Sequence, residues 1–194
     1  MIKLVFATNN LNKIKEVQAL VPQHIELLSL KDIGCLEDIP ETQDTIEGNA
    51  KQKADYIKTN YNYDCFADDT GLEVDALNGA PGVRSARYAG EQRNDNDNMD
   101  KLLSELKSHN NRSAQFKTVI SLNLNNNSHI FTGICKGDII LTKLGKNGFG
   151  YDPIFKPKGH NETFAEMDLS LKNSLSHRGK AISQLIAHLN AIHI

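Results

Sequence analysis

Three distant stretches of the sequence carry polar residues of the types that bind and transform charged ligands. Each stretch lies where an apolar segment meets a turn, which is where α/β proteins build their sites, because backbone groups at the ends of helices lack partners. The stretches are Thr8-Asn9-Asn10 with Lys13, Asp68-Asp69-Thr70-Gly71, and Ser176-His177-Arg178-Gly179.

The first stretch offers backbone N–H groups and short side chains at the start of an expected helix. With Lys13 one turn inside that helix, the arrangement suits a phosphate group. An ordinary helix cap formed by Asn10 is the simpler interpretation of this stretch taken alone. A P-loop is excluded because the chain contains no G-x-x-x-x-G-K-[ST] sequence.

Asp68 and Asp69 are expected to end a strand, in which neighbouring side chains point to opposite faces. Two adjacent like charges favour a nearby cation, and carboxylate oxygens suit Mg²⁺ that is held jointly with phosphates. The alternative is an acidic turn in which an Asp caps the local backbone. Glu41 could complete a metal site, although other acids of the same segment are equally available: Glu37, Asp38 and Asp44.

His177 and Arg178 fall in the first turn of the last expected helix, where the helix dipole disfavours positive charge. Cationic side chains at a position that disfavours positive charge suggest a partner that accepts hydrogen bonds, such as a phosphate or a carbonyl of a ligand. An exposed pair without a role is the alternative. Zinc is not expected, because the histidines show no metal-ligand spacing.

The glycine-rich loop at 145–150 does not join a first strand to a helix, so it is not a dinucleotide fingerprint. It places Phe149 between glycines, where the ring could stack on a base or be tucked into the core.

These residues need a framework, and hydrophobic periodicity predicts one. A nearly continuous apolar run at 2–7 predicts a central strand covered on both faces. A helix follows it, Thr45 can cap an Ala-rich helix that carries Lys53, and a turn is expected at 68–71. A hairpin loop is expected at 125–128. The expected strands are 2–7, 25–30, 64–68, 72–77, 114–124 and 129–141, and further helices are expected at 47–56, at 96–107 and from about 176. Strands that alternate with helices and then form a long hairpin predict an α/β fold with a mixed sheet.

The chain has 194 residues, enough for one large domain or two small lobes that bury about 70% of the unfolded surface. Its formal net charge of -2 argues against a broad nucleic-acid-binding face. Three widely spaced cysteines predict neither disulfides nor a thiolate zinc site and fit a reducing cytoplasm. We expect no membrane span, because no segment approaches about 20 apolar residues, and no export.

Taken together and in order, the motifs resemble those of the inosine triphosphate pyrophosphatase family, the non-canonical purine NTP pyrophosphatases (dITP/XTP diphosphatases). Each motif alone is weak, whereas the ordered set covers nearly the whole chain. The matching segments are Thr8-Asn9-Asn10-Leu11-Asn12-Lys13, Glu41-Thr42, Glu47-Gly48-Asn49-Ala50 with Lys53-Ala54, Ala67-Asp68-Asp69-Thr70-Gly71-Leu72, Gly79-Ala80-Pro81-Gly82-Val83, Ser85-Ala86-Arg87-Tyr88, Gly148-Phe149-Gly150-Tyr151-Asp152-Pro153, Lys172 and Ser176-His177-Arg178-Gly179. Arg84 departs from the pattern, in which Tyr is more usual, and this puts the contacts of its loop in doubt.

The resemblance implies a single domain over 1–194, in which an elongated mixed β-sheet is flanked by helices and two lobes surround a central nucleotide-binding cleft. It implies Mg²⁺-dependent hydrolysis of ITP, dITP and XTP to the monophosphate and pyrophosphate by a cytoplasmic enzyme that usually forms a homodimer.

The resemblance also implies roles for individual residues. Asp69 would bind Mg²⁺ and activate water, with Asp68 and Glu41 supporting the metal site and Lys13 assisting catalysis. Which of Asp68 and Asp69 takes the proton stays open at this point. The residues implied to bind the triphosphate are Thr8, Asn9, Asn10, Leu11, Asn12, Lys13 and Lys53, and those implied to contact the nucleotide are Thr70, Phe149, Gly150, Tyr151, Asp152, Lys172, His177 and Arg178.

The chemistry agrees with these roles, because a water that attacks the α-phosphorus needs a carboxylate to accept its proton. A 6-keto purine offers an acceptor to His177 or Arg178, whereas adenine would face them with a donor. Two alternatives stay open: a related pyrophosphatase that acts on other altered bases, and a nucleotide-binding regulator without turnover. A nucleic-acid-binding module is a more distant one.

Overall fold

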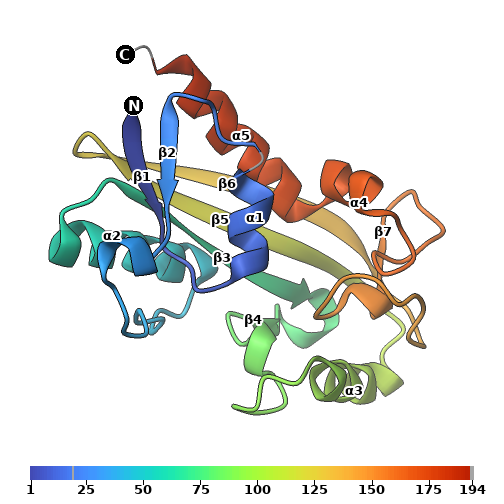
Figure 1. Ribbon diagram of the computed structural model, residues 1–194. Coiled ribbons are helices and arrows are strands. Elements are labelled where there is room, and N and C mark those ends of the chain that lie inside the picture. The colour runs from blue at the N-terminus through green and yellow to red at the C-terminus, as the bar shows by residue number, and fades with distance from the viewer. Residues whose placement is uncertain (19, 193–194) are drawn as a thin grey trace. The chain divides into compact units, whose positions relative to one another are not determined.

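The computed structural model describes residues 1–18 and 20–192, without the side chains of residues 11, 12, 15 and 16. Figure 1 shows its helices and strands. The strands are β1 (Ile2–Phe6), β2 (Ile25–Leu28), β3 (Cys65–Val74), β4 (Pro81–Gly82), β5 (Ser113–Leu124), β6 (Asn127–Ile139) and β7 (Phe155–Pro157). The α-helices are α1 (Leu11–Gln18), α2 (Ile46–Tyr61), α3 (Asp95–Glu105), α4 (Leu169–Leu175) and α5 (His177–Ala191).

The strands form one mixed sheet in the order β2-β1-β3-β5-β6-β7, with β4 paired to β3. β1 pairs in parallel with both β2 and β3, whereas β4 and β7 pair antiparallel with β3 and β6. The predicted α/β class, the mixed sheet and the interior place of the first strand are confirmed.

The chain divides into two compact units. The first unit comprises Met1–Asp69, Thr118–Thr132 and Ala181–Ile194, and the second comprises Thr70–Lys117 and Gly133–Lys180. Four elements continue from one unit into the other: β3, β5, β6 and α5.

In the first unit, alternate residues of β1 and β3 enter different cores. Phe6 and Phe66 stack with ring centroids 4.4 Å apart, in a core that also takes apolar residues of α1 and α5. Val5 and Ala67 enter the opposite core together with residues of α2. These strands are therefore covered on both faces, which explains their continuous apolar sequence.

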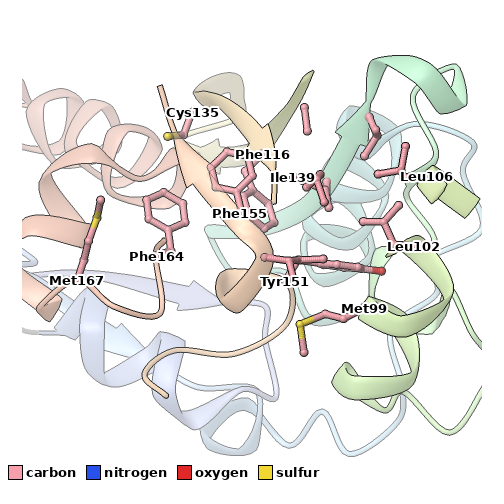
Figure 2. Close-up of a cluster of buried hydrophobic side chains, with 14 residues drawn as sticks. Met99, Leu102, Leu106, Phe116, Cys135, Ile139, Tyr151, Phe155, Phe164 and Met167 are labelled. Atoms are coloured by element: carbon pink, nitrogen blue, oxygen red, sulfur yellow. The ribbon is translucent and has the colours of Figure 1, made fainter. Parts of the chain in front are cut away.

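The second unit has a separate core, shown in Figure 2. Phe116 contacts Phe155 edge to face at 4.7 Å between ring centroids, and Met99 and Leu102 of α3 join the same cluster. Tyr151 is buried there and donates a hydrogen bond of 2.8 Å to the carbonyl oxygen of Ser85. The hydroxyl therefore has a hydrogen-bond partner although the ring is packed among apolar side chains.

The expected turn at 68–71 is wrong, because β3 runs without interruption from Cys65 to Val74. Residues 72 and 73 pair with β4, which keeps the chain extended beyond the two aspartates. The predicted strand at 72–77 ends at Val74, and residues 75–77 form a turn of 3₁₀ helix. The two short strands β4 and β7 and the helix α4 were not predicted.

The predicted hairpin is confirmed and its turn is tighter than expected. Only Asn125 and Asn126 lie between β5 and β6, and their φ angles are 51° and 62°. Asparagine tolerates this left-handed conformation, which two-residue hairpin turns require. Among the described residues, no helix is long and apolar enough to cross a membrane.

Candidate active site

The start of α1 is held by a local network of hydrogen bonds. The Asn10 Oδ1 atom accepts from the backbone N–H of Lys13 at 3.3 Å, and the Thr8 Oγ1 atom accepts from the N–H of Asn10 at 3.2 Å. The expected helix cap is confirmed, and Asn9 and Asn10 are exposed. The side chains of Leu11 and Asn12 lie outside the described part of the chain.

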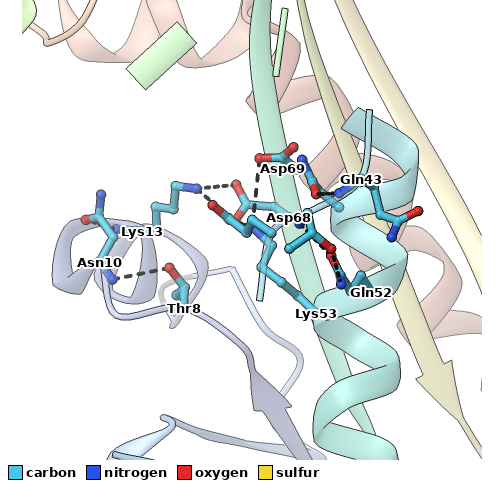
Figure 3. A network of polar contacts seen from close by, with 11 residues as sticks. Thr8, Asn10, Lys13, Gln43, Gln52, Lys53, Asp68 and Asp69 are labelled. Atoms are coloured by element: carbon cyan, nitrogen blue, oxygen red, sulfur yellow. Dashed lines mark hydrogen bonds and ion pairs between the residues drawn. The ribbon is translucent and has the colours of Figure 1, made fainter. Parts of the chain in front are cut away.

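Asp68 forms a buried ion pair with Lys13 (Figure 3). The Lys13 Nζ atom lies 2.8 and 2.7 Å from the two carboxylate oxygens, and the Asp68 side chain is only 3% exposed. Asp68 shares its strand face with Phe66, on the side of the sheet that packs against α1. The short distances and the burial make this a strong charge-assisted contact.

Asp69 lies on the opposite strand face, on the side of α2, near a second lysine. The Lys53 Nζ atom is 3.8 Å from Asp69 Oδ1 and 2.5 Å from Glu41 Oε1. Lys53 is buried, so it does not belong to a solvated face of α2. Burial by itself lowers the pKa of Lys53, but attraction by Asp69, Asp68 and Glu41 outweighs it, so the pKa lies above its ordinary value.

The first unit thus brings together three carboxylates and two lysines from four segments. Glu41 is the acid of its segment that reaches this cluster, whereas Glu37 contacts Tyr56 and Tyr61 instead. Among the described residues, no cluster of three or more His, Cys, Asp or Glu side chains has an arrangement that could hold a metal ion by itself. Asp69 and Glu41 nevertheless fit Mg²⁺, which is commonly bound by one or two carboxylates together with substrate phosphates and water.

In the second unit, a buried carboxylate shapes the loop that displays Phe149. The Asp152 Oδ2 atom accepts from the backbone N–H of Phe149 at 2.8 Å and from Lys172 Nζ at 2.5 Å. A Cβ atom on Gly148, whose φ is +78°, would approach that oxygen to 2.1 Å, so the loop requires glycine there. Phe149 is 52% exposed, and the alternative of a ring tucked into the core is wrong.

Two cationic side chains lie near the ring of Phe149. Lys172 Nζ lies 5.2 Å and Arg178 Cζ lies 5.4 Å from the centre of the Phe149 ring, both within cation–π range. His177 is buried and stacks on Phe116 at 4.5 Å between ring centroids, so it is not an idle surface residue. The N–H of Gly179 donates to Ser176 Oγ at 3.0 Å, which confirms that the last helix begins after Ser176.

The side chain of Tyr151 is buried, and its hydroxyl binds the protein backbone. Burial raises the pKa of its hydroxyl, which therefore stays neutral while it binds Ser85. Thr70 is partly buried within β3.

Sequence reasoning missed residues that hold the site in place. Asp95 Oδ2 accepts from the N–H of Gly150 at 2.7 Å. Gln52 and Asn49 bind the segment that carries Glu41. Asp95 had no distinguishing signal among several acids near the start of its helix, whereas helical spacing from Lys53 could have singled out Asn49.

Comparisons with known proteins agree with the motif set. The model of the Ham1 family matches residues 4–188. The chain is 66% identical over 189 residues to the dITP/XTP pyrophosphatase of Flavobacterium johnsoniae, covering 97% of this chain and 98% of that protein. It is also similar to two solved structures, the Ham1 protein of Staphylococcus aureus and a HAM1 protein of Coxiella burnetii. The first has a TM-score of 0.92 and 40% identity, covering 97% of this chain and 98% of that one. The second has a TM-score of 0.95 and 39% identity, covering 99% and 100%. Because a single family model and full-length relatives span both units, the chain belongs to the Ham1 family.

Proposed function

We propose that the protein is an Mg²⁺-dependent nucleoside triphosphate pyrophosphatase that hydrolyses ITP, dITP and XTP to the monophosphate and pyrophosphate. The observation that carries the proposal is the pair of aspartates on β3, one joined to Lys13 and the other placed near Lys53 and Glu41. The similarity to the dITP/XTP pyrophosphatases of Flavobacterium johnsoniae and Porphyromonas gingivalis supports the same reaction.

The first unit is proposed to act on the triphosphate. The start of α1, after Thr8, Asn9 and Asn10, would present the positive end of the helix to the phosphates, and the Thr8 and Asn10 side chains fix the backbone there. Lys13 and Lys53 supply positive charge, and the raised pKa of Lys53 keeps it protonated near neutral pH. Leu11 and Asn12, whose side chains lie outside the described part, stay in the proposed phosphate segment.

We propose Asp69 as the base that accepts the proton of the attacking water. Asp68 is nearly closed off by its bidentate contact with Lys13, whereas Asp69 is 16% exposed. Asp69 and Glu41 would hold Mg²⁺, which when bound neutralises charge on the phosphates and on the departing pyrophosphate. Asp68 then serves to fix Lys13 rather than to take the proton.

The second unit is proposed to act on the base of the nucleotide. The exposed face of Phe149 offers a stacking surface, and Arg178, His177 and Lys172 supply donors for an acceptor such as the 6-keto oxygen. Adenine would present a donor to these donors and be rejected. Asp152 and Gly150 shape the Phe149 loop, while Thr70 and Tyr151 complete the proposed contacts.

We further propose that both units form one functional domain, that the chain forms a homodimer and that it acts in the cytoplasm. One family model spans both units. The cysteines at 35, 65 and 135 are free and buried, as suits a reducing compartment. Light scattering coupled to gel filtration measures the oligomeric state, and a monomer at micromolar concentration would contradict the dimer.

The decisive experiment follows pyrophosphate and monophosphate release from dITP, ITP, XTP, GTP and ATP with and without Mg²⁺. We expect metal-dependent pyrophosphate release from dITP, ITP and XTP that far exceeds release from GTP and ATP. Nucleotide binding without turnover would favour a regulator, and orthophosphate as the first product would mean that a different bond is cleaved. Turnover confined to other altered bases would favour the related pyrophosphatase.

A further inference from the structure

Glu41 lies on a segment, residues 35–45, that has no helix or strand of its own. A metal ligand on such a segment needs an external support, because irregular backbone is not held by a ladder of hydrogen bonds. The support comes from α2, whose apolar residues Ala54 and Ile57 pack on the sheet. The polar residues Asn49, Gln52, Lys53 and Tyr56 recur on α2 at the spacing of one helix face.

Two residues of this polar stripe bind the backbone directly after Glu41 (Figure 3). The N–H of Thr42 donates to Gln52 Oε1 at 2.9 Å, and Gln52 Nε2 donates to Thr42 Oγ1 at 2.9 Å. The N–H of Gln43 donates to Asn49 Oδ1 at 2.9 Å, and the Asn49 side chain is buried. The amide of Gln52 therefore holds Thr42 at two points.

The segment also comes very close to the helix at Gly48. A Cβ atom added at Gly48 would lie 2.7 Å from the Cβ atom of Gln43, which is closer than real Cβ atoms approach another heavy atom. On the other side of Glu41, the Glu37 Oε1 atom accepts from Tyr56 Oη at 3.0 Å and from Tyr61 Oη at 2.5 Å. The segment is thus bound to α2 on both sides of Glu41.

We propose that Gln52 is a positioning residue for the metal site: its two-point contact with Thr42 holds Glu41 beside Lys53 and Asp69, where Glu41 can bind Mg²⁺. The proposal rests on the proposed function and names a residue that touches neither the phosphates nor the metal. Loss of the contact loosens the segment at Thr42, next to Glu41, while its other contacts with α2 remain, so that Mg²⁺ binding must also bring Glu41 into place. Residues that orient metal ligands typically change metal affinity or activity by about 10- to 100-fold.

The test uses Gln52→Met, which keeps the size of the side chain and removes both hydrogen bonds. Lys51→Met is the matched control, because it places the same residue one position earlier, on an exposed part of α2. Thr42→Val removes only the acceptor of one hydrogen bond and retains the N–H donor of the other. The measurements are the Mg²⁺ concentration that gives half-maximal pyrophosphate release from dITP, the turnover at saturating Mg²⁺, and the hydrogen exchange of the Thr42 and Gln43 amides without metal or nucleotide.

For Gln52→Met we expect an Mg²⁺ requirement raised about tenfold, turnover at saturating Mg²⁺ within about threefold of wild type, and faster exchange of both amides. Lys51→Met should leave all three values unchanged. Thr42→Val should give a smaller rise, and adding it to Gln52→Met should cause no further change, because both alterations break the same contact.

The proposal is overturned by an unchanged Mg²⁺ requirement in Gln52→Met, or by a loss of turnover that saturating Mg²⁺ does not restore. Additive effects of Thr42→Val and Gln52→Met would also overturn it. If the wild-type protein itself releases no pyrophosphate, the proposed function fails and the metal role falls with it. Amide exchange would then still report whether Gln52 holds the segment, so the two failures are distinguishable.

Discussion

Asp68 and Asp69 carry the same functional group but have different surroundings because side chains alternate along β3. Asp68 faces α1 and is 3% exposed beside Lys13, whereas Asp69 faces α2 and shares Lys53 with Glu41. A carboxylate already bound twice by an ammonium group is a poor proton acceptor. These surroundings support the proposal that Asp69, rather than Asp68, is the base.

We predict that Asp69→Asn lowers turnover of dITP by about 10²- to 10⁴-fold, the usual contribution of a general base. The exchange preserves the shape of the side chain, so the melting temperature should stay within a few degrees of wild type. Steady-state kinetics and a thermal melt check both statements, with Asp44→Asn, an exposed acid of the 35–45 segment, as the control. Near-normal turnover of Asp69→Asn would refute the assignment.

Phe149 is the residue for which exposure itself suggests a function, because an aromatic residue that stays 52% exposed gains little from folding. We predict that Phe149→Ala raises the KM for dITP about tenfold or more, since stacking on a base contributes about 1–3 kcal/mol. Turnover at saturating substrate should change far less. Leu144→Ala alters another exposed apolar residue near this loop and serves as the control; an equal KM effect there would argue against stacking.

At the scale of elements, α5 packs on β6 through histidines as well as through apolar residues. The rings of His129 and His188 lie 4.4 Å apart, and His188 also contacts Phe131 at 5.4 Å between ring centroids. Burial, with a smaller contribution from His129, lowers the pKa of His188. The folded protein therefore binds a proton at His188 less readily than the unfolded chain does.

The sign of the pH effect follows from that difference in proton binding. The contribution of a neutral His188 to stability is present above the ordinary pKa of about 6.5 and is lost as the pH falls through the lowered folded-state pKa. We predict that His188→Phe reduces the loss of melting temperature between pH 7.5 and pH 5 by a few degrees at most. Thermal melts at both pH values check this, with the exposed His109→Phe as the control. Equal pH dependence in wild type and His188→Phe would show that the ring pair is not the cause.

At the scale of the whole molecule, we expect the two units to fold together rather than as independent domains. β3, β5, β6 and α5 each contribute residues to both units, so the loss of one unit interrupts strands and a helix of the other. Domains that fold alone are instead joined by linkers that few contacts cross. The chain should therefore unfold cooperatively.

We predict one unfolding transition in urea with the same midpoint for probes in either unit. The chain contains no tryptophan, so Tyr63→Trp and Tyr88→Trp each introduce a single probe, the first in the first unit and the second in the second. Fluorescence of each variant is compared with its own far-ultraviolet circular dichroism. Two midpoints separated by more than the fitting error would show that the units unfold independently.

What the sequence determined by itself is mostly local. The Asn10 and Thr45 caps, a hairpin with its loop near 125–128 and most helices followed from spacing within a few residues, because caps and turns depend on short-range geometry. The order of weak motifs along the whole chain predicted the family. The mixed sheet followed from the order of strands and helices.

Only the tertiary structure decided which charged groups meet. The aspartates were expected at a turn, yet pairing with β4 keeps β3 extended and sends Asp68 and Asp69 to opposite helices. The sequence offered several acids near Glu41, and the folded segment brings Glu41 to Lys53 while Gln52 holds its neighbour. These contacts join residues far apart in the chain, and no local pattern encodes them because they depend on how α1, α2 and β3 pack together.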